Sequence, residues 1–257
     1  MTPTRTAAAA ARLARLDALA AAFARRPGAL AFLALGSGAE PERLDAWSDL
    51  DFFAIVEPDQ LDARLTSLDW IAEAAPIAWS FRNTPDGHKV LFDDGVLAEF
   101  AVFAPDVLAS IPFSPGRVVW ARADFDPARL APTRRAPTDA SDEVWLVGEL
   151  LSNLLVGLGR FHRGERVAAH RLVQVDAVDR LLQLLDQRAE GGLGRPGRDG
   201  WNGARRVERR LALAPATLEQ WMPGLAATPA AARAILDAVR GLAPVPSALE
   251  AAIRAAL

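Results

Sequence analysis

The sequence contains no cysteine among its 257 residues. That absence excludes disulfide bonds, thiolate zinc sites and cysteine nucleophiles together. Histidine is also scarce, and His88, His162 and His170 lack the spacing of a zinc site. We therefore expect the chemistry of this chain to rest on other side chains.

The sequence also lacks a strong charge of either sign and a long hydrophobic run. Its formal net charge is -3 and its pI is near 5.7, so nothing attracts the whole chain to nucleic acid. No uninterrupted apolar run reaches the roughly 18 residues of a membrane helix, and the N-terminus has no signal-peptide arrangement. We expect a cytoplasmic protein that binds neither nucleic acid nor membrane.

The residues that are present predict two structural halves. A hydrophobic fraction of 51% supports a full core. Periodicity predicts helices over residues 6–26 and 58–75, strands over 77–82, 89–92 and 96–103, and an edge strand over 117–120. Helices are predicted over 142–161 and 165–187, with shorter ones from about 204, 228 and 247, where Thr228 is expected to cap. The predicted fold is an α/β (α+β) domain with a mixed sheet in residues 1–130, followed by an all-α helical bundle in 137–257.

The stretch from residue 33 to 56 carries the main chemical pattern. Gly36 and Ser37 directly follow an apolar strand, where small residues let backbone N–H groups and a hydroxyl approach phosphate oxygens. Asp49 and Asp51 are two residues apart on an extended segment, so both carboxylates are expected on one face. Paired carboxylates of this kind suit Mg²⁺, which takes its other ligands from substrate phosphates.

Gly-Ser, a connector of about ten residues and Asp-x-Asp on a strand together resemble the signature of the DNA polymerase beta-like nucleotidyltransferase superfamily. Glu99, between Ala98 and Phe100 in an apolar strand, matches the third acid of that family. With its helix-rich second half, the chain looks most like the aminoglycoside and lincosamide nucleotidyltransferases. It departs from them at Glu40, where many relatives carry a basic residue, and at Glu99, where the antibiotic-modifying relatives usually have Asp.

The resemblance implies an enzyme that depends on Mg²⁺ and moves a nucleoside monophosphate from a nucleoside triphosphate, such as ATP, to a hydroxyl of a small, antibiotic-like acceptor. The implied metal ligands and catalytic acids are Asp49, Asp51 and Glu99, and the implied nucleotide-binding residues are Gly36, Ser37 and Ser48. Lys89, the only lysine, is either a phosphate contact beside these strands or a solvated hairpin residue. A homodimer is a possible assembly.

The general base is expected from the helical half, because the strand acids are committed to metal. Glu149 lies on the polar side of the 142–161 helix with Trp145, Ser152 and Asn153, where partial burial would raise its pKa. Glu165 is the second choice, and Asp176 is the next.

Two alternative functions and two local features are also considered. A regulatory protein that binds nucleotide without transfer is one alternative, and a HEPN-type ribonuclease using Arg163 and His170 is another. Trp79 and Phe81 alternate on one strand and are expected in the core rather than as a base-stacking platform. The arginine run is expected to be solvated rather than to meet the triphosphate; its members are Arg205, Arg206, Arg209 and Arg210.

Overall fold

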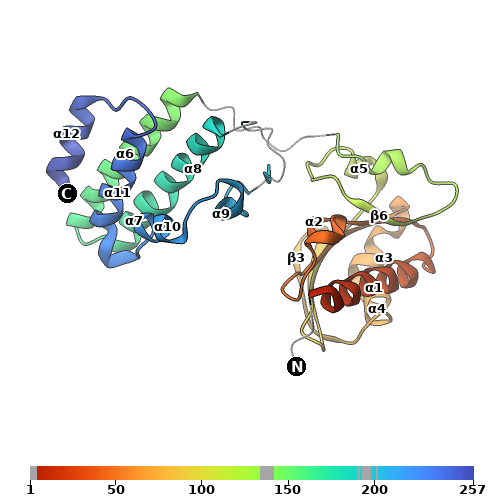
Figure 1. The fold of residues 1–257 in the computed structure, drawn as a ribbon. Helices are drawn as coiled ribbons and strands as arrows, with labels where there is room; N and C mark the ends of the chain where they lie inside the picture. Colours follow the sequence, from red (N-terminus) through yellow and green to blue (C-terminus); the bar gives the residue numbers. More distant parts are fainter. Residues whose placement is uncertain (1–4, 134–141, 190–191, 193–197, 201) are drawn as a thin grey trace. The chain divides into compact units, whose positions relative to one another are not determined.

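The chain divides into two compact units, Met1–Ala136 and Pro137–Leu257, each with a hydrophobic core of its own. The computed structural model describes residues 5–133, 142–189, 192, 198–200 and 202–257 (Figure 1).

Unit 1 is built on a mixed six-stranded sheet with the strand order β3-β4-β5-β2-β1-β6. The strands are β1 (Ala29–Ala34), β2 (Leu50–Val56), β3 (Ile77–Thr84), β4 (Gly87–Phe92), β5 (Leu97–Phe103) and β6 (Arg117–Ala121). β2 and β5 are parallel, and the other neighbouring pairs are antiparallel. The predicted mixed sheet is confirmed, including the edge position of β6.

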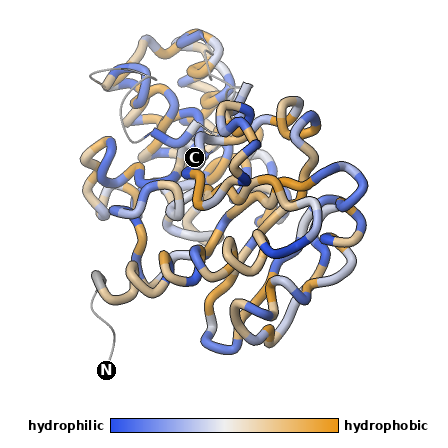
Figure 2. The backbone as a smooth tube through the Cα atoms, turned by 90° about the vertical axis from the view of Figure 1, so that its right-hand side faces the viewer, coloured by the Kyte–Doolittle hydropathy of each residue, from blue (hydrophilic) through white to orange (hydrophobic). Residues whose placement is uncertain are grey.

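The two faces of the sheet are covered differently. α1 (Arg5–Ala24), α3 (Leu61–Thr66) and α4 (Asp69–Ala72) pack on one face over alternate residues of β2 and β5. Phe52 stacks on Phe100 there with ring centroids 5.2 Å apart. On the other face, α5 (Pro105–Leu108) and the 3-10 turn η3 (Pro127–Leu130) cover a smaller cluster that includes Ile55 and Phe103. Figure 2 shows the resulting alternation of hydrophobic strand and helix segments with hydrophilic loops.

The single helix expected over residues 58–75 is wrong. The segment consists of a 3-10 turn, η2 (Pro58–Gln60), and the two short helices α3 and α4. Ser67 is extended between them (φ -104°, ψ 127°), and its Oγ accepts a hydrogen bond from the Asp69 N–H at 3.3 Å. Serine competes with the helix by bonding the backbone locally, so the apolar spacing survives while the helix breaks.

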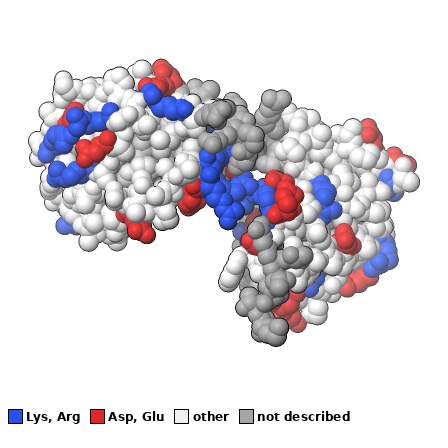
Figure 3. All heavy atoms as spheres, in the orientation of Figure 1, with Lys and Arg blue, Asp and Glu red and all other residues white. Residues whose placement is uncertain are grey.

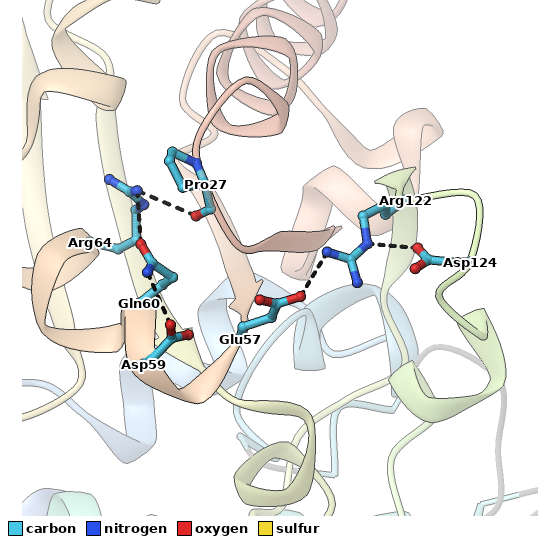
Figure 4. A network of polar contacts seen from close by, with 7 residues as sticks. All are labelled: Pro27, Glu57, Asp59, Gln60, Arg64, Arg122 and Asp124. Atoms are coloured by element: carbon cyan, nitrogen blue, oxygen red, sulfur yellow. Dashed lines mark hydrogen bonds and ion pairs between the residues drawn. The ribbon is translucent and has the colours of Figure 1, made fainter.

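A polar network fixes the strand ends opposite the start of β2 (Figure 4). The Arg122 guanidinium, just after β6, donates to Glu57 Oε1 at 2.8 Å and to Asp124 Oδ1 at 2.6 Å. Glu57 directly follows β2, and the Arg122 N–H donates to the Leu30 carbonyl of β1. Three neighbouring strands are thereby held in register at this end.

Unit 2 is helical. Its longer helices are α6 (Glu143–His162), α8 (Ala177–Arg188), α11 (Thr228–Arg240) and α12 (Ser247–Ala256), and its shorter ones are α7 (Arg166–His170), α9 (Val207–Arg210) and α10 (Pro215–Trp221). α6 packs against α7, α8, α11 and α12 with all of its leucines buried except Leu155, which is partly buried. Among the described helices, α6 is the one long and apolar enough to cross a membrane, a test that the core helix of a helical bundle also passes.

The long helix expected over 165–187 contains a π-helical segment, Arg171–Asp176, between α7 and α8. Within it, the buried Gln174 side chain donates to Thr228 Oγ1 at 3.0 Å and accepts from the Gly224 N–H at 2.9 Å. The expected capping role of Thr228 is wrong. α11 begins at Thr228 itself, and its hydroxyl donates to the Leu225 carbonyl instead, because burial beside Gln174 demands both bonds.

The arginine run expected to be solvated is partly buried. Arg210 pairs with Asp186 of α8, both side chains being 3% exposed. Arg198 also approaches Asp186, at 3.5 Å, while Arg205 pairs with Asp199 at 3.2 Å. The expectation is wrong for Arg210. Its ion-pair partner, Asp186, belongs to another helix, so local sequence does not reveal the pairing. Figure 3 shows charged side chains of both signs on one face of each unit.

Candidate functional site

Four side chains form one row across the sheet of unit 1. Phe81 of β3 pairs with Lys89 of β4, Lys89 pairs with Glu99 of β5, and Glu99 pairs with Asp51 of β2. Residues directly opposite each other on neighbouring strands point to the same face. Asp51 alternates with the buried Leu50 and Phe52, so this row lies on the face away from α1.

Glu99 is engaged on both carboxylate oxygens. Its Oε2 pairs with Lys89 Nζ at 3.0 Å, and its Oε1 accepts from Asn83 Nδ2 at 2.7 Å. Lys89 therefore lies within β4 of the β3–β4 hairpin, with its ammonium group beside Glu99. Asn83 was missed by sequence reasoning. The register of β3 and β4 shifts between Arg82 and Thr84, and such an irregularity re-aims a side chain that sequence alternation does not place.

Gly36 brings the loop after β1 against Asp51. Its φ is +52°, and a Cβ atom at this position would lie 2.6 Å from Asp51 Oδ2. The Leu35 N–H donates to the Asp51 carbonyl at 2.7 Å, which ties the loop to β2. Gly36 also starts the short helix α2 (Gly36–Ala39), which contains Ser37. Only glycine fits between this turn and the carboxylate.

The connector between α2 and β2 is held by local bonds. Ser48 Oγ donates to Asp45 Oδ1 at 3.1 Å and accepts from the Asp45 N–H at 3.0 Å. Arg12 of α1 donates to the Ser48 and Ala46 carbonyls at 2.9 and 3.0 Å. Asp49 is exposed and precedes the first residue of β2, whereas Asp51 is half-buried within the strand.

The donor atoms of the row suit a hard cation. Mg²⁺ in proteins is held by one or two carboxylates together with substrate phosphates, and the paired Asp51 and Glu99 provide the two carboxylates. Within the described residues, no three His, Cys, Asp or Glu side chains are already grouped as ligands. The contacts of Glu99 with Lys89 and Asn83 account for its present orientation.

The aromatic pair on β3 is exposed, so the expectation that it lies in the core is wrong. Trp79 is 50% and Phe81 45% exposed, and their ring centroids are 5.0 Å apart. β3 is an edge strand, and α5 and η3 cover a different part of this face. An aromatic alternation on an edge strand does not by itself reveal whether a layer covers it.

The expected general base lies in unit 2, on α6. The partial burial expected for Glu149 is wrong, because its side chain is exposed. Its carbonyl accepts from Ser152 Oγ at 3.0 Å, and Trp145 one turn earlier lies under the Arg180 guanidinium at 5.2 Å. The second choice, Glu165, is held by two arginines. A hydrogen bond from Arg160, supported by Arg163, lowers the pKa of the Glu165 carboxyl, although partial desolvation opposes the shift.

Arg163 and His170, the residues of the ribonuclease alternative, lie on different elements. Arg163 follows the last residue of α6 and donates from Nε to Glu165 at 3.0 Å. His170 ends α7 and is half-buried. The guanidinium that this alternative needs is therefore already engaged in an ion pair.

Comparison with known proteins gives distant likenesses of fold. No family model matches the chain, and no curated protein does. The structure of an aminoglycoside 6-adenyltransferase from Bacillus subtilis aligns with 93% of this chain and 95% of its own, at 11% identity and a TM-score of 0.30. The CD-NTase CdnG from Bradyrhizobium diazoefficiens, in complex with GTP, aligns with 90% of this chain and 99% of its own, at 16% identity and a TM-score of 0.27. Likenesses this distant say nothing of a shared activity, which has to be inferred from the side chains.

Proposed function

We propose that this protein is a nucleotidyltransferase that moves a nucleoside monophosphate from a nucleoside triphosphate to a hydroxyl of a small molecule. The observation that carries the proposal is the in-register pair of Asp51 and Glu99 with Gly36 packed against the Asp51 carboxylate. Two acids and a glycine turn converge on the face of the sheet away from α1, and phosphoryl transfer needs mainly positioning and charge stabilisation.

Asp51 and Glu99, together with Asp49, would hold Mg²⁺. When bound, the ion supplies neutralisation of phosphate charge and polarisation of the α-phosphate. The chain itself would contribute the Gly36–Ser37 backbone and the Ser37 hydroxyl toward the phosphates. The Ser48 hydroxyl would have to leave Asp45 Oδ1 to donate to a phosphate oxygen. Lys89, already beside Glu99, adds a positive charge to the same row.

We assign the general base to Glu149 in the helical unit. Its role would be to accept the proton of the acceptor hydroxyl, which requires a carboxylate that is not already committed to an ion pair. Glu165 is a poorer candidate, because Arg160 and Arg163 hold its carboxylate in the ionised form.

A nucleotide-binding protein without transfer is the second candidate. The observation that favours it is the engagement of both Glu99 oxygens with Lys89 and Asn83, which competes with metal ligation. This candidate predicts saturable nucleotide binding and no release of pyrophosphate.

Asp51→Asn tests the proposal. The full chain is incubated with labelled nucleoside triphosphates, Mg²⁺ and a panel of hydroxylated small molecules, and pyrophosphate is measured. We expect wild-type turnover to fall to background in Asp51→Asn while thermal unfolding stays close to that of wild type, since the change removes repulsion between neighbouring acids. Asp93→Asn, in the exposed turn after β4, is the matched control and should retain activity. Equal turnover in Asp51→Asn and wild type would refute the assignment.

A further inference from the structure

The exposed rings of β3 lie on the same face of the sheet as the acids. Trp79 pairs with Leu91, and Leu91 pairs with Leu97, in the row next to that of Phe81, Lys89, Glu99 and Asp51. Leu91 and Leu97 are half-buried, and both rings are about half exposed. We name Trp79, Phe81, Leu91 and Leu97 the aromatic platform.

The platform lies on one definite side of the acids. Moving along the row from the Gly36 turn, one meets Asp51, then Glu99, then Lys89 and finally Phe81. The phosphate-binding turn and the platform are therefore at opposite ends of the row. With neighbouring strands about 4.8 Å apart, Phe81 is roughly 10 Å from Glu99 and roughly 14 Å from Asp51.

In-line displacement decides which substrate reaches the platform. The attacking and leaving oxygens lie on opposite sides of the phosphorus atom. In the proposed reaction the leaving pyrophosphate is held at the Gly36 end, so the attacking hydroxyl approaches from the Glu99 side. An acceptor whose hydroxyl lies near Glu99 extends over Lys89 toward Trp79 and Phe81.

We propose that Trp79 and Phe81 bind a ring of the acceptor, and that the acceptor is a two-ring hydroxylated compound with an uncharged face. This inference rests on the proposed function and names its substrate class. The four platform side chains are apolar and include no carboxylate, so a polycationic acceptor gains nothing there. The aromatic faces instead favour stacking on a planar ring or on the apolar face of a sugar.

The bond changes follow from the proposed transfer. The acceptor oxygen forms a new bond to the α-phosphorus, the bond from that phosphorus to the bridging oxygen of pyrophosphate breaks, and the hydroxyl proton passes to the general base. The platform takes no part in these steps. Trp79 and Phe81 are binding residues that set which hydroxyl is presented.

The test uses phenyl β-D-glucopyranoside as the two-ring probe and sorbitol as its ringless counterpart. Binding of each to the full chain is measured calorimetrically with a non-hydrolysable ATP analogue and Mg²⁺ present. Trp79→Leu and Phe81→Leu keep an apolar side chain and remove only the ring. Val118→Ala is the matched control, because Val118 is 40% exposed on β6 at the opposite edge of the sheet.

We expect each ring loss to weaken probe binding about two- to tenfold, the range for one aromatic contact, with the double variant weaker still. Binding of sorbitol, of the ATP analogue and of inorganic tripolyphosphate should be unchanged in these variants. Val118→Ala should bind the probe as tightly as wild type. The proposal is overturned if wild type does not bind the probe, or if ring loss leaves probe binding unchanged. It is also overturned if ring loss weakens binding of the ATP analogue but not binding of tripolyphosphate, since the platform would then hold the nucleobase.

The same proteins separate this inference from the proposed function. If pyrophosphate release depends on Asp51 but probe binding is the same with and without the two rings, the transferase proposal stands and the aromatic platform is rejected. Ring-dependent probe binding without any pyrophosphate release keeps the platform as a ligand site and rejects the transfer.

Discussion

At the scale of single residues, Gly36 combines two constraints that are usually separate. Its positive φ is a conformation that other residues adopt at a cost, and its missing side chain leaves room for the Asp51 carboxylate. From its position after an apolar strand, Gly36 is predicted only to let phosphate oxygens approach the backbone. The structure adds that the acid itself depends on it.

Gly36→Ala should therefore lose activity as well as stability. The new Cβ would meet Asp51 Oδ2 at 2.6 Å and push the carboxylate out of line with Glu99. Gly95→Ala is the control, because Gly95 has a φ of +81° with nothing within 4 Å of an added Cβ. Backbone strain of about 1–2 kcal/mol is expected in both variants, measured by urea unfolding. Pyrophosphate release should fall only in Gly36→Ala, and retained activity there would show that Asp51 tolerates displacement.

Asp94 predicts how the stability of unit 1 depends on pH. Partial burial alone would raise its pKa, but the hydrogen bonds from the Val96 N–H and from Arg15 outweigh burial and lower the pKa below its ordinary 3.8. A carboxyl with a depressed pKa stabilises the fold above its unfolded pKa and loses that contribution as pH falls through the folded pKa.

Asp94→Asn should thus destabilise the protein at pH 7 and progressively less below about pH 3.8. The loss at pH 7 should stay below about 1 kcal/mol, because the pair with Arg15 is exposed to solvent. Urea unfolding of both proteins between pH 7 and pH 3 measures the difference. A difference that is constant with pH would mean that the charge of Asp94 is not involved.

At the scale of elements, the strands were predictable and several helix boundaries were not. Alternation placed Glu99 on β5 and Asp51 on β2, and the pairing of β2 with β5 then aligned them. The helix expected over 58–75 is broken because Ser67 Oγ accepts from the Asp69 N–H. The π-helical segment was not predicted because its cause, the hydrogen bond from Gln174 to Thr228 of α11, is a tertiary contact. Periodicity indicates which face of a segment is apolar, but it does not show where a polar side chain interrupts the helical hydrogen bonds.

The contact between α8 and α9 depends on a buried ion pair. Asp186 lies between Arg210 and Arg198, whose side chains are 3% and 9% exposed, and burial lowers the pKa of Arg210. Removing one partner leaves charge uncompensated in a low-dielectric setting.

Asp186→Asn should accordingly lower the free energy of unfolding by about 3–5 kcal/mol, the cost of breaking a buried pair. Asp237→Asn is the control, because Asp237 is 56% exposed in its contact with Arg254 and should cost less than about 1 kcal/mol. Chemical denaturation followed by far-ultraviolet circular dichroism compares the two. Equal losses would mean that solvent reaches Asp186.

At the scale of the whole molecule, the described residues form separate hydrophobic clusters in the two units. The clusters around Phe52 and Ile55 lie wholly within Met1–Ala136, and the cluster around Leu150 lies wholly within Pro137–Leu257. The sequence indicated this division through the change from strands to helices. It did not indicate that Trp79 and Phe81 would be exposed, because coverage of an edge strand depends on which other segments pack there.

When the two units are produced as separate fragments, we expect phosphate binding in one fragment and no complete transfer reaction in either. Residues 1–136 contain the Gly36 turn, Asp51 and Glu99, so this fragment should fold cooperatively and bind tripolyphosphate with an affinity close to that of the full chain. It lacks Glu149 and should not release pyrophosphate, because the assigned base belongs to residues 137–257. Isothermal calorimetry and the pyrophosphate assay measure both properties, and the second fragment alone is the control for residual activity. Transfer by residues 1–136 at the full rate would place the base within the sheet unit, and an unfolded fragment would show that its core requires the helical partner.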